Sequence, residues 1–343
     1  MKKILYVLNT GVYSGAENVT LQIINNLDKT KYKGIYTSLD GEIRGRVEQS
    51  GIQFEPLAKL NARNLRKVIK RVNPDIIHAN DYTAACVSVA AFPHVPVIAH
   101  LHNNSKWIQK LNIRSVLFGL CAPRCEKILV VSDAIVREYI FKSVITKKAE
   151  CIGNPIDIKK IQSIHPHQEK KEYDIIVLGR LSEAKDPIRA LRIIKQVSSD
   201  RDIRTIFVGD GELRGLVESY IEENNMSDIV ELAGFQKNPY EYISKSKALL
   251  MPSAWEGFGL AAVEGLAYGI PVVSSAAGGL PEIVDESCGR VCTTDEQFID
   301  EIIRLLSDEE YYISKCNGAR SRAEILDNSE RYFRRINKIY EEL

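Results

Sequence analysis

Two glutamates frame the segment of the chain best suited to chemistry. Glu256 and Glu264 lie eight residues apart in SAWEGFGLAAVE, which follows an apolar strand-like run and opens a predicted helix. The first turn of that helix, whose positive end attracts phosphate, holds the N–H groups of Phe258, Gly259 and Leu260. Glu264, two turns on, is placed to reach ribose hydroxyls. The segment therefore predicts binding of a phosphorylated, hydroxylated ligand, with a plain pair of surface carboxylates as the alternative.

Two cations flank a second predicted strand-to-helix loop, GRLSEAK (residues 179–185). Arg180 leaves the end of the strand, and Lys185 begins the next helix. A guanidinium can bind one phosphate through two hydrogen bonds, while an ammonium supplies a point charge to another. We therefore expect a diphosphate at this loop; solvated surface cations are the alternative that these residues alone leave open.

A glycine-rich loop near the start of the chain, TGVYSGAE (residues 10–17), also opens a helix. Free backbone N–H groups around Gly15 and Ala16 would face an anion there. A turn with no ligand is the alternative.

Polar side chains follow two predicted strands of the first half. They are His78, Asn80 and Asp81 after one strand and His100, His102 and Asn103 after another. Because alternate residues of a strand lie on one face, we expect hydrogen bonds from this set to a hydroxylated substrate. Structural histidines are the alternative. No carboxylate adjoins the histidines at 100 and 102, so we expect no metal site.

Two other motifs imitate known sites in the wrong context. Gly209, Gly211 and Gly215 resemble a dinucleotide fingerprint, but the last spacing is wrong and the motif follows a domain's second strand. Asp200-Arg-Asp202 resembles a metal-binding pair, but it precedes its strand instead of following it. The seven cysteines include two C-x3-C pairs that no further ligand completes to a zinc set. We expect reduced thiols and no cofactor.

Parallel sheets are needed to position these loops. Apolar runs of strand length alternate with amphipathic helices, the pattern of a parallel sheet covered on both faces. Strands are predicted at 4–8, 34–39, 53–56, 75–78, 95–101 and 127–131, and again at 174–178, 204–208, 229–232, 248–251 and 271–274. Helices of the second half are predicted near 186–197, 212–224, 258–268 and 295–307. Because the pattern restarts, we predict an α/β chain of two Rossmann-like doubly wound domains.

The domain limits follow from one polar stretch. QSIHPHQEKK (residues 162–171) has no apolar periodicity and is predicted to be a linker. The first domain is then expected over 1–161 and the second over 172–325. A final helix over 326–343 is expected to be able to pack back onto the first domain.

Composition excludes several classes of protein. With 343 residues, 45% apolar content and a formal net charge of +1, the chain is neither disordered nor basic enough to predict nucleic-acid binding. The apolar run after Lys2 and Lys3 is too short for a signal peptide, and the run 84–92 is too short to span a bilayer. We expect a cytoplasmic protein.

Glu256 and Glu264 resemble the E-x7-E signature of the retaining GT-B glycosyltransferases, glycosyl transferases group 1. Further motifs occur in that family's order between residues 4 and about 284: SGAE (14–17) is similar to its G-G-A-E, NPID (154–157) to N-G-V-D, GR with Lys185 to G-R-x4-K, VGDGE (208–212) to V-G-D-G-x, and PVV (271–273) with GGLPE (278–282) to P-V-V and G-G-x-x-E. The chain departs from the pattern at Ser14 and Pro155, where the family has glycine.

The resemblance implies roles for the residues found above. Arg180 and Lys185 would bind the donor diphosphate, Glu264 the ribose, and Glu256 the hydroxyls of the donor sugar. The Gly15 loop would close on the phosphates and His102 would touch sugar, which makes Glu256, His102, Arg180 and Lys185 the implied catalytic set. The other strand-end polar residues of the first half would lie on the acceptor side.

The implied reaction is metal-independent, retaining transfer of a hexose from a nucleotide-diphosphate sugar, with UDP as the expected nucleotide. HLHN (100–103) resembles a subset of the family associated with capsule and exopolysaccharide assembly, so the expected acceptor is a glycan or a lipid-linked glycan. A nucleotide-sugar epimerase of the same fold and a non-catalytic partner subunit are the alternatives.

Two stretches of the first half are basic without acids. Between Tyr82 and Cys125 there is no Asp or Glu, and Lys106, Lys110, Arg114 and Arg124 accompany apolar residues. The predicted helix 61–72 is likewise basic, with an apolar stripe. We hypothesise that the first domain docks on an anionic membrane surface, on the inner face of the membrane. An apolar stripe buried under a solvated back is the alternative for each helix.

Overall fold

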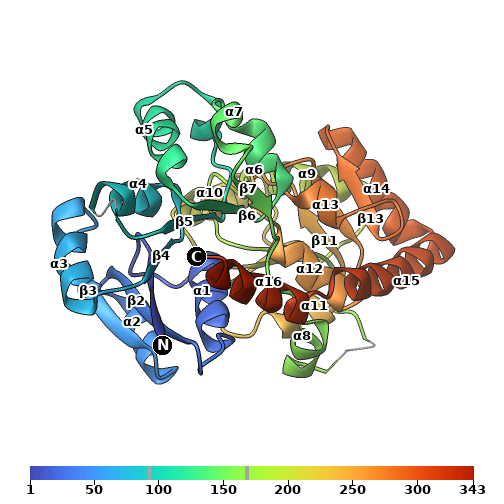
Figure 1. Cartoon of the computed structure of the whole chain (residues 1–343). Helices are drawn as coiled ribbons and strands as arrows, with labels where there is room; N and C mark the ends of the chain where they lie inside the picture. The colour runs from blue at the N-terminus through green and yellow to red at the C-terminus, as the bar shows by residue number, and fades with distance from the viewer. Residues whose placement is uncertain (92–93, 167–169) are drawn as a thin grey trace. The chain divides into compact units, whose positions relative to one another are not determined.

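The structure, a computed structural model, describes residues 1–91, 94–166 and 170–343 and divides into two compact units. Met1–Pro155 and Ser329–Leu343 form the first unit, and Ile156–Asn328 form the second. Each unit contains one parallel sheet with helices packed on it (Figure 1). The predicted α/β architecture of two Rossmann-like domains is confirmed.

The first unit has a seven-stranded sheet in the order β3-β2-β1-β4-β5-β6-β7. Its strands are β1 (Lys2–Val7), β2 (Tyr32–Leu39), β3 (Gln53–Leu57), β4 (Ile76–Ala79), β5 (Val97–Leu101), β6 (Lys127–Val130) and β7 (Ala149–Cys151). Its helices are α1 (Gly15–Asn25), α2 (Glu42–Gln49), α3 (Ala62–Val72), α4 (Tyr82–Ala91), α5 (Ile113–Cys121), α6 (Asp133–Glu138), α7 (Lys142–Ile145) and α16 (Ser329–Glu341), with short 3-10 turns at Lys106–Gln109 and Ala122–Arg124. The central strands are buried on both faces, which explains their continuous apolar runs.

The last helix, α16, packs within the first unit. The hydroxyl of Tyr340 lies 2.9 Å from that of Tyr6 in β1. Nη2 of Arg335 donates to Oε2 of Glu150 at 2.7 Å. Hydrogen bonding from Arg335 is the main reason that the pKa of Glu150 falls to about 2. Aromatic packing and a paired carboxylate thus attach the end of the chain to the first sheet.

The second unit has a six-stranded sheet in the order β10-β9-β8-β11-β12-β13. Its strands are β8 (Tyr173–Leu178), β9 (Thr205–Val208), β10 (Val230–Gly234), β11 (Ser246–Met251), β12 (Val272–Ser275) and β13 (Gly289–Cys292). Its helices are α8 (Ile158–Ile164), α9 (Pro187–Val197), α10 (Arg214–Glu223), α11 (Tyr240–Ser244), α12 (Leu260–Ala267), α13 (Leu280–Ile283), α14 (Asp295–Ser307) and α15 (Glu309–Leu326).

Helices cover both faces of the second sheet. Ile176 belongs to one hydrophobic cluster, and its neighbours Ile175 and Val177 belong to another. Since successive side chains of a strand point to opposite faces, the two clusters are the two cores of the unit. The helices therefore hold the sheet from both sides and leave the carboxyl ends of its strands to carry loops.

The structure departs from the prediction at the domain limits. The chain passes between units at Pro155–Ile156 and Asn328–Ser329, not within the predicted linker 162–171. Residues 162–164 end α8, whose Ile158 packs in a core of the second unit, and residues 167–169 lie outside the described residues. The prediction also missed β7 and β13, which are short edge strands with polar residues.

Candidate functional site

The carboxyl ends of β8 and β11 lie side by side at the centre of the second sheet. The two strands pair directly, although β9 and β10 come between them in the chain. Doubly wound folds bind ligands outside the strand ends where the strand order reverses in this way. The loops that leave these two strands carry Lys185 and Glu256.

Lys185 and Glu256 form an ion pair between the two loops. Nζ of Lys185 donates to Oε2 of Glu256, and Oγ of Ser253 lies 3.4 Å from the same oxygen. The side chains are 25% and 12% exposed, respectively, so the pair is largely withdrawn from water. The structure thus places a cation suited to phosphate and a carboxylate suited to hydroxyls at one point.

Backbone and hydroxyl contacts fix the loops around this pair. The carbonyl of Ala184 accepts from the N–H groups of Ala254 at 2.9 Å and Trp255 at 3.3 Å. Ser275, at the end of β12, donates from Oγ to the carbonyl of Ser253 at 2.7 Å. Three strand-end loops are therefore held together. Sequence analysis missed Ser275 because it binds backbone 22 residues away in the sequence.

Gly259 begins α12 in a conformation that requires glycine. Its φ is +106°, and a Cβ there would lie 2.7 Å from Cδ2 of Leu280. With no side chain at this position, no side-chain cap occupies the N–H groups of the first turn, although the carbonyl of Gly259 accepts from the N–H of Ala262 at 2.9 Å. The N–H of Gly279 donates to the carbonyl of Gly257 at 3.1 Å and holds the turn in place. The predicted phosphate-binding segment from Phe258 to Leu260 is thus a fixed helix start.

Glu264 lies on α12, beyond the helix start. The hydroxyl of Tyr240 lies 3.2 Å from its Oε1. Burial raises the pKa of Glu264 to about 7, against the lowering effects of this hydrogen bond and of the charge on Lys185. A carboxyl group that titrates near neutrality can both accept and donate hydrogen bonds to hydroxyls. Sequence analysis did not find Tyr240.

Arg180 makes a different contact from Lys185. Its side chain is 69% exposed, and its Nε lies 3.1 Å from Oε2 of Glu212. An exposed pair of this kind contributes little stability and is easily exchanged. The predicted diphosphate contact therefore requires Arg180 to leave Glu212.

The glycines that resemble a dinucleotide fingerprint allow two loops to pack closely. A Cβ on Gly209 would lie 1.9 Å from the carbonyl oxygen of Gly179, and one on Gly211 would lie 2.3 Å from that of Leu181. Gly215 has nothing within 4 Å. Two of the three glycines thus bring the loops after β8 and β9 together, which explains them without a dinucleotide.

In the first unit, His78 and His100 are fully buried. His78 is within 2.7 Å of the Tyr340 hydroxyl through Nδ1 and within 3.1 Å of His100 through Nε2. Burial lowers the pKa of both rings, to about 3 for His78, so both are neutral. The predicted acceptor contact of these two residues is wrong, because neither ring reaches solvent. They are structural histidines.

His102 and Asn80 lie at the ends of the same strands. Oδ1 of Asn80 is 3.3 Å from Nε2 of His102, whose ring centroid lies 4.0 Å from that of His100 with the rings tilted by 36°. Burial lowers the pKa of His102 to about 3. Asn80 is itself 2% exposed, so the structure gives it the role of orienting His102 and not the predicted acceptor contact.

Asp81 and Asn103 complete the predicted acceptor-side set. Oδ1 of Asp81 accepts from the N–H of Ala84 at 2.5 Å and so caps α4. Burial raises the pKa of Asp81 to about 6. The Asn103 side chain is exposed and accepts from the hydroxyl of Ser105 at 3.0 Å. Both residues thus place polar side-chain atoms just after the ends of β4 and β5.

The loop before α1 has the predicted form. Gly15 is exposed at the helix start, and Ala16 is half-buried. Ser14, which replaces a glycine of the family motif, has a φ of −146°, an extended backbone that serine adopts readily. Its hydroxyl donates to the buried carboxylate of Glu17, whose pKa is raised by burial. The substitution thus leaves the loop unstrained.

Two family profiles match the chain in succession. Residues 13–160 match Glycosyltransferase Family 4, and residues 157–322 match Glycosyl transferases group 1. The two glycosyltransferase profiles together cover residues 13–322, so this chain is a glycosyltransferase. In this glycosyltransferase, the second match covers the whole strand-end site from Arg180 to Glu264.

Individual relatives agree with this assignment. The N-acetylgalactosamine-N,N'-diacetylbacillosaminyl-diphospho-undecaprenol 4-alpha-N-acetylgalactosaminyltransferase of Campylobacter jejuni is 26% identical over 238 residues, which cover 68% of this chain and 64% of that protein. The N-acetyl-alpha-D-glucosaminyl L-malate synthase of Bacillus anthracis is 24% identical over 314 residues, covering 85% and 81%. The crystal structure of Anabaena HepE with UDP and glucose matches with a TM-score of 0.87 at 20% identity over 100% of both chains, a likeness in fold.

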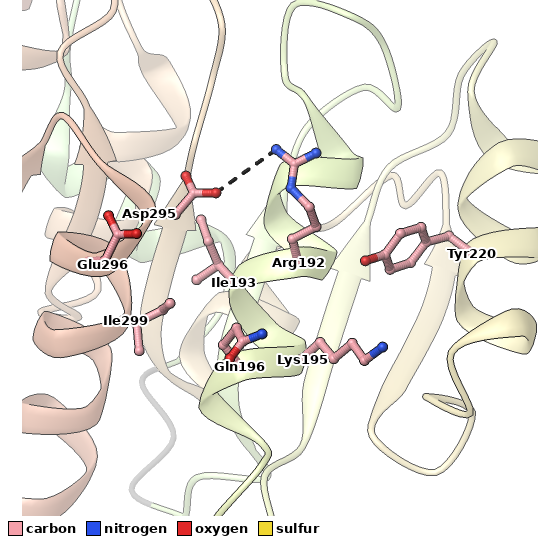
Figure 2. Close-up of a pocket in the computed structure, with 8 residues that line it drawn as sticks. All are labelled: Arg192, Ile193, Lys195, Gln196, Tyr220, Asp295, Glu296 and Ile299. Carbon is pink, nitrogen blue, oxygen red and sulfur yellow. Dashed lines mark ion pairs between the residues drawn. The ribbon is translucent and has the colours of Figure 1, made fainter.

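A separate cavity of about 470 Å³ lies among α9, α10 and α14 of the glycosyltransferase (Figure 2). It is lined by Arg192, Ile193, Lys195, Gln196, Tyr220, Asp295, Glu296 and Ile299. Asp295 is bound by Nε of Arg189 at 2.7 Å, and Nη2 of Arg192 lies 4.0 Å away. None of the predicted site residues lines this cavity, and the carboxylate of Asp295 is already paired with Arg189.

The described residues contain neither a metal-binding cluster nor a helix suited to cross a membrane. In residues 1–91, 94–166 and 170–343, no three His, Cys, Asp or Glu side chains gather as a metal-binding group. No helix in the same ranges combines the length and apolar character needed to cross a bilayer.

Proposed function

We propose that this glycosyltransferase transfers a sugar from a UDP-sugar, with retention at the anomeric carbon, to a glycan or lipid-linked glycan in cell-surface polysaccharide synthesis. The donor is assigned to the second unit and the acceptor to the first. The crystal structure of Anabaena HepE with UDP and glucose supports the choice of nucleotide. The name of the Campylobacter relative, which contains a diphospho-undecaprenol-linked substrate, supports a lipid-linked acceptor.

The ion pair between Lys185 and Glu256 carries the proposal. It lies at the reversal of strand order, and Gly259 begins a helix in the same loop as Glu256. When the donor binds, a phosphate oxygen takes the place of Glu256 on Lys185. The released carboxylate then accepts hydrogen bonds from the sugar hydroxyls. This one exchange of partners thus positions both the phosphate and the sugar, the two groups joined by the bond that breaks.

The chemistry needs positive charge at the leaving group. As the bond between the anomeric carbon and the phosphate oxygen breaks, negative charge builds on the diphosphate. Lys185, Arg180 and the N–H groups at the start of α12 stabilise that charge, and each well-placed donor contributes about 3 kcal/mol to the transition state. The acceptor oxygen forms the new bond on the same face of the sugar and passes its proton to a phosphate oxygen. Because these protein groups supply the charge, we propose turnover without a divalent cation.

The polar strand ends of the first unit provide the acceptor side. His102, Asp81 and Asn103 retain polar atoms there, and Asn80 orients the imidazole. Because the neutral imidazole donates its one N–H to Oδ1 of Asn80, its Nδ1 can accept a hydrogen bond from a hydroxyl without adding charge. We propose that these groups bind acceptor hydroxyls at the cytoplasmic face of the membrane.

A panel of nucleotide-sugars tests the function. Mass spectrometry of the protein with each donor and a cell-derived acceptor fraction should detect a glycosylated acceptor together with UDP. An altered sugar nucleotide formed without acceptor would show an epimerase instead. Failure of every nucleoside diphosphate to bind in calorimetry would refute the donor site.

A further inference from the structure

Helix α5 presents an apolar face to solvent. Ile113, Leu117 and Leu120 are 76%, 50% and 65% exposed, and Leu111, just before the helix, is 71% exposed. Residues 113, 117 and 120 are spaced as neighbours on one side of a helix. Val116, between them, is also exposed. This arrangement is the reverse of a helix that turns its apolar stripe to the core.

The opposite face of α5 holds the helix firmly in place. The ring of Phe118 is fully buried and lies 4.9 Å from the ring of Tyr82 and 5.6 Å from that of Tyr139. The Tyr139 hydroxyl donates to the carbonyl of Ser115 at 2.6 Å. Asn112 and Ser115 form a capping box at the helix start. The exposed leucines therefore stand on an anchored helix and not on a frayed end.

The apolar face continues onto the segment around α7. A Cβ on Gly119 would lie 3.3 Å from the ring of Phe141, so that residue lies against α5. Ile140 and Val144, on either side of it in the chain, are 41% and 36% exposed. Figure 1 shows α5 and α7 near one another in the first unit. We call the exposed apolar residues of these two segments, together with their cations, the α5 surface.

The two segments that form the α5 surface are basic. Residues 104–125 and 139–149 contain no Asp or Glu, and their basic residues are Lys106, Lys110, Arg114, Arg124, Lys142, Lys147 and Lys148. The intervening residues 126–138 hold three acids, Glu126, Asp133 and Glu138. Of these, Glu138 accepts hydrogen bonds from Asn104 at 2.9 Å and Gln109 at 2.8 Å. The surface therefore combines exposed apolar side chains with net positive charge.

Helix α3 has a similar composition but the opposite arrangement. Its apolar stripe, Leu65, Val68, Ile69 and Val72, is buried. Two of its arginines are engaged: Arg66 donates to the carbonyl of Ala91 at 2.9 Å, and Arg71 pairs with Glu55. The α3 helix is thus an ordinary amphipathic helix with a solvated basic back, the alternative left open by the sequence. Of these two helices, α5 is the one that keeps apolar groups available to a partner.

We propose that the α5 surface docks on an anionic lipid bilayer, with the leucines of α5 in the headgroup layer and the cations on the lipid phosphates. Docking on a bilayer would bring the enzyme to a lipid-linked acceptor, so this inference rests on the proposed function. A bilayer offers apolar and anionic groups together, as this surface requires. A second copy of the chain fits less well, because a symmetric contact would set the same cations against each other.

Sedimentation with vesicles tests the docking. The wild-type protein should sediment with phosphatidylglycerol-containing vesicles at low salt and far less with phosphatidylcholine alone. The double variant Leu117→Ser with Leu120→Ser should lose at least about tenfold in partitioning, since both side chains are already exposed in the fold. Leu216→Ser is the matched control, because Leu216 is 55% exposed on α10 of the second unit.

Charge reversal gives a second, independent comparison. Lys110→Glu with Arg114→Glu should weaken sedimentation by about tenfold or more, whereas Lys67→Glu with Lys70→Glu on α3 should change it much less. Calorimetry with UDP on the same variants should show unchanged binding. The donor assignment is thus tested separately from the docking.

Several results would overturn the docking. They are equal or absent sedimentation of the wild-type protein with both vesicle types at low salt, and equal loss in the Leu216 control. A solution dimer that the Leu117 and Leu120 changes dissociate, without vesicle binding, would assign the surface to a second copy. In each case, unchanged UDP binding would mean that the donor-site assignment is unaffected.

Discussion

In the second unit, the ammonium of Lys185 and the carboxylate of Glu256 neutralise each other across two strand-end loops. The proposed donor uses the two groups separately, one on phosphate and the other on sugar. Binding therefore replaces a protein ion pair by two protein–ligand contacts. The two residues should consequently respond in opposite ways to a nucleotide that carries no sugar.

Replacing each partner in turn separates their roles. Lys185→Met should weaken UDP binding about tenfold or more, because it removes a cation from the diphosphate. Glu256→Gln should bind UDP as tightly as the wild-type protein or more tightly, since Lys185 then has no anionic partner to leave. The same variant should lose transfer. Calorimetry and a transfer assay measure the two effects.

Lys195→Met is the control for this pair, because Lys195 lines the separate cavity among α9, α10 and α14. It should leave both binding and transfer unchanged. If Glu256→Gln weakened UDP binding as much as Lys185→Met, the exchange of partners would be disproved.

Glu264 should make stability depend on pH. Burial raises its pKa in the folded protein to about 7, above the ordinary 4.5. The folded state therefore binds this proton more tightly than the unfolded state, and the group's stabilising contribution is lost as pH rises from about 4.5 to about 7. Because the group is partly exposed, we expect the loss to be on the order of 1–2 kcal/mol.

The Glu264→Gln variant removes this titration. Relative to the wild-type protein, it should gain free energy of unfolding between pH 5 and about 8. Denaturant unfolding of both proteins at several pH values measures the difference. A constant difference across this range would contradict the raised pKa.

The sequence indicated that Lys185 and Glu256 follow strands of one sheet, although it did not predict their ion pair, because this placement depends on topology. In a parallel sheet all carboxyl ends of strands lie at one edge, so cations after one strand and carboxylates after another are brought near each other. The motif spacing then selected Lys185 and Glu256. Their placement at strand ends follows from local patterns and a fold rule, both of which can be read from a single sequence, whereas their contact required the structure.

The contacts that the sequence did not indicate join distant segments. His78 meets Tyr340, which lies 262 residues later, and no local pattern links a strand end to the last helix. The hydrogen bond of Tyr240 to Glu264 depends likewise on the packing of α11 against α12. The sequence could not tell which face of α5 is buried, because Phe118 and the exposed leucines are equally apolar.

The glycine motif after β9 gives a structural prediction. Gly209→Ala should destabilise the protein strongly, by about 3 kcal/mol or more, because its φ is +145° and the added Cβ would meet the Gly179 carbonyl at 1.9 Å. Gly215→Ala should be neutral or stabilise by roughly 0.5–1 kcal/mol, since that glycine lies within α10 with open space around it. Chemical denaturation of both variants tests the contrast. Equal effects would mean that the two loops do not pack as closely as described.

Transfer should proceed without a divalent cation. A metal ion on a diphosphate would neutralise the charge that develops as the sugar leaves. In this glycosyltransferase, Lys185, Arg180 and the start of α12 are proposed to supply that positive charge, with Arg180 released from its exposed pair with Glu212. Turnover in excess chelator should therefore equal turnover with added Mg²⁺, and Lys185→Met should lose transfer under both conditions. Activity that disappears in chelator and returns only with Mg²⁺ or Mn²⁺ would show instead that these protein groups do not suffice to stabilise the leaving diphosphate.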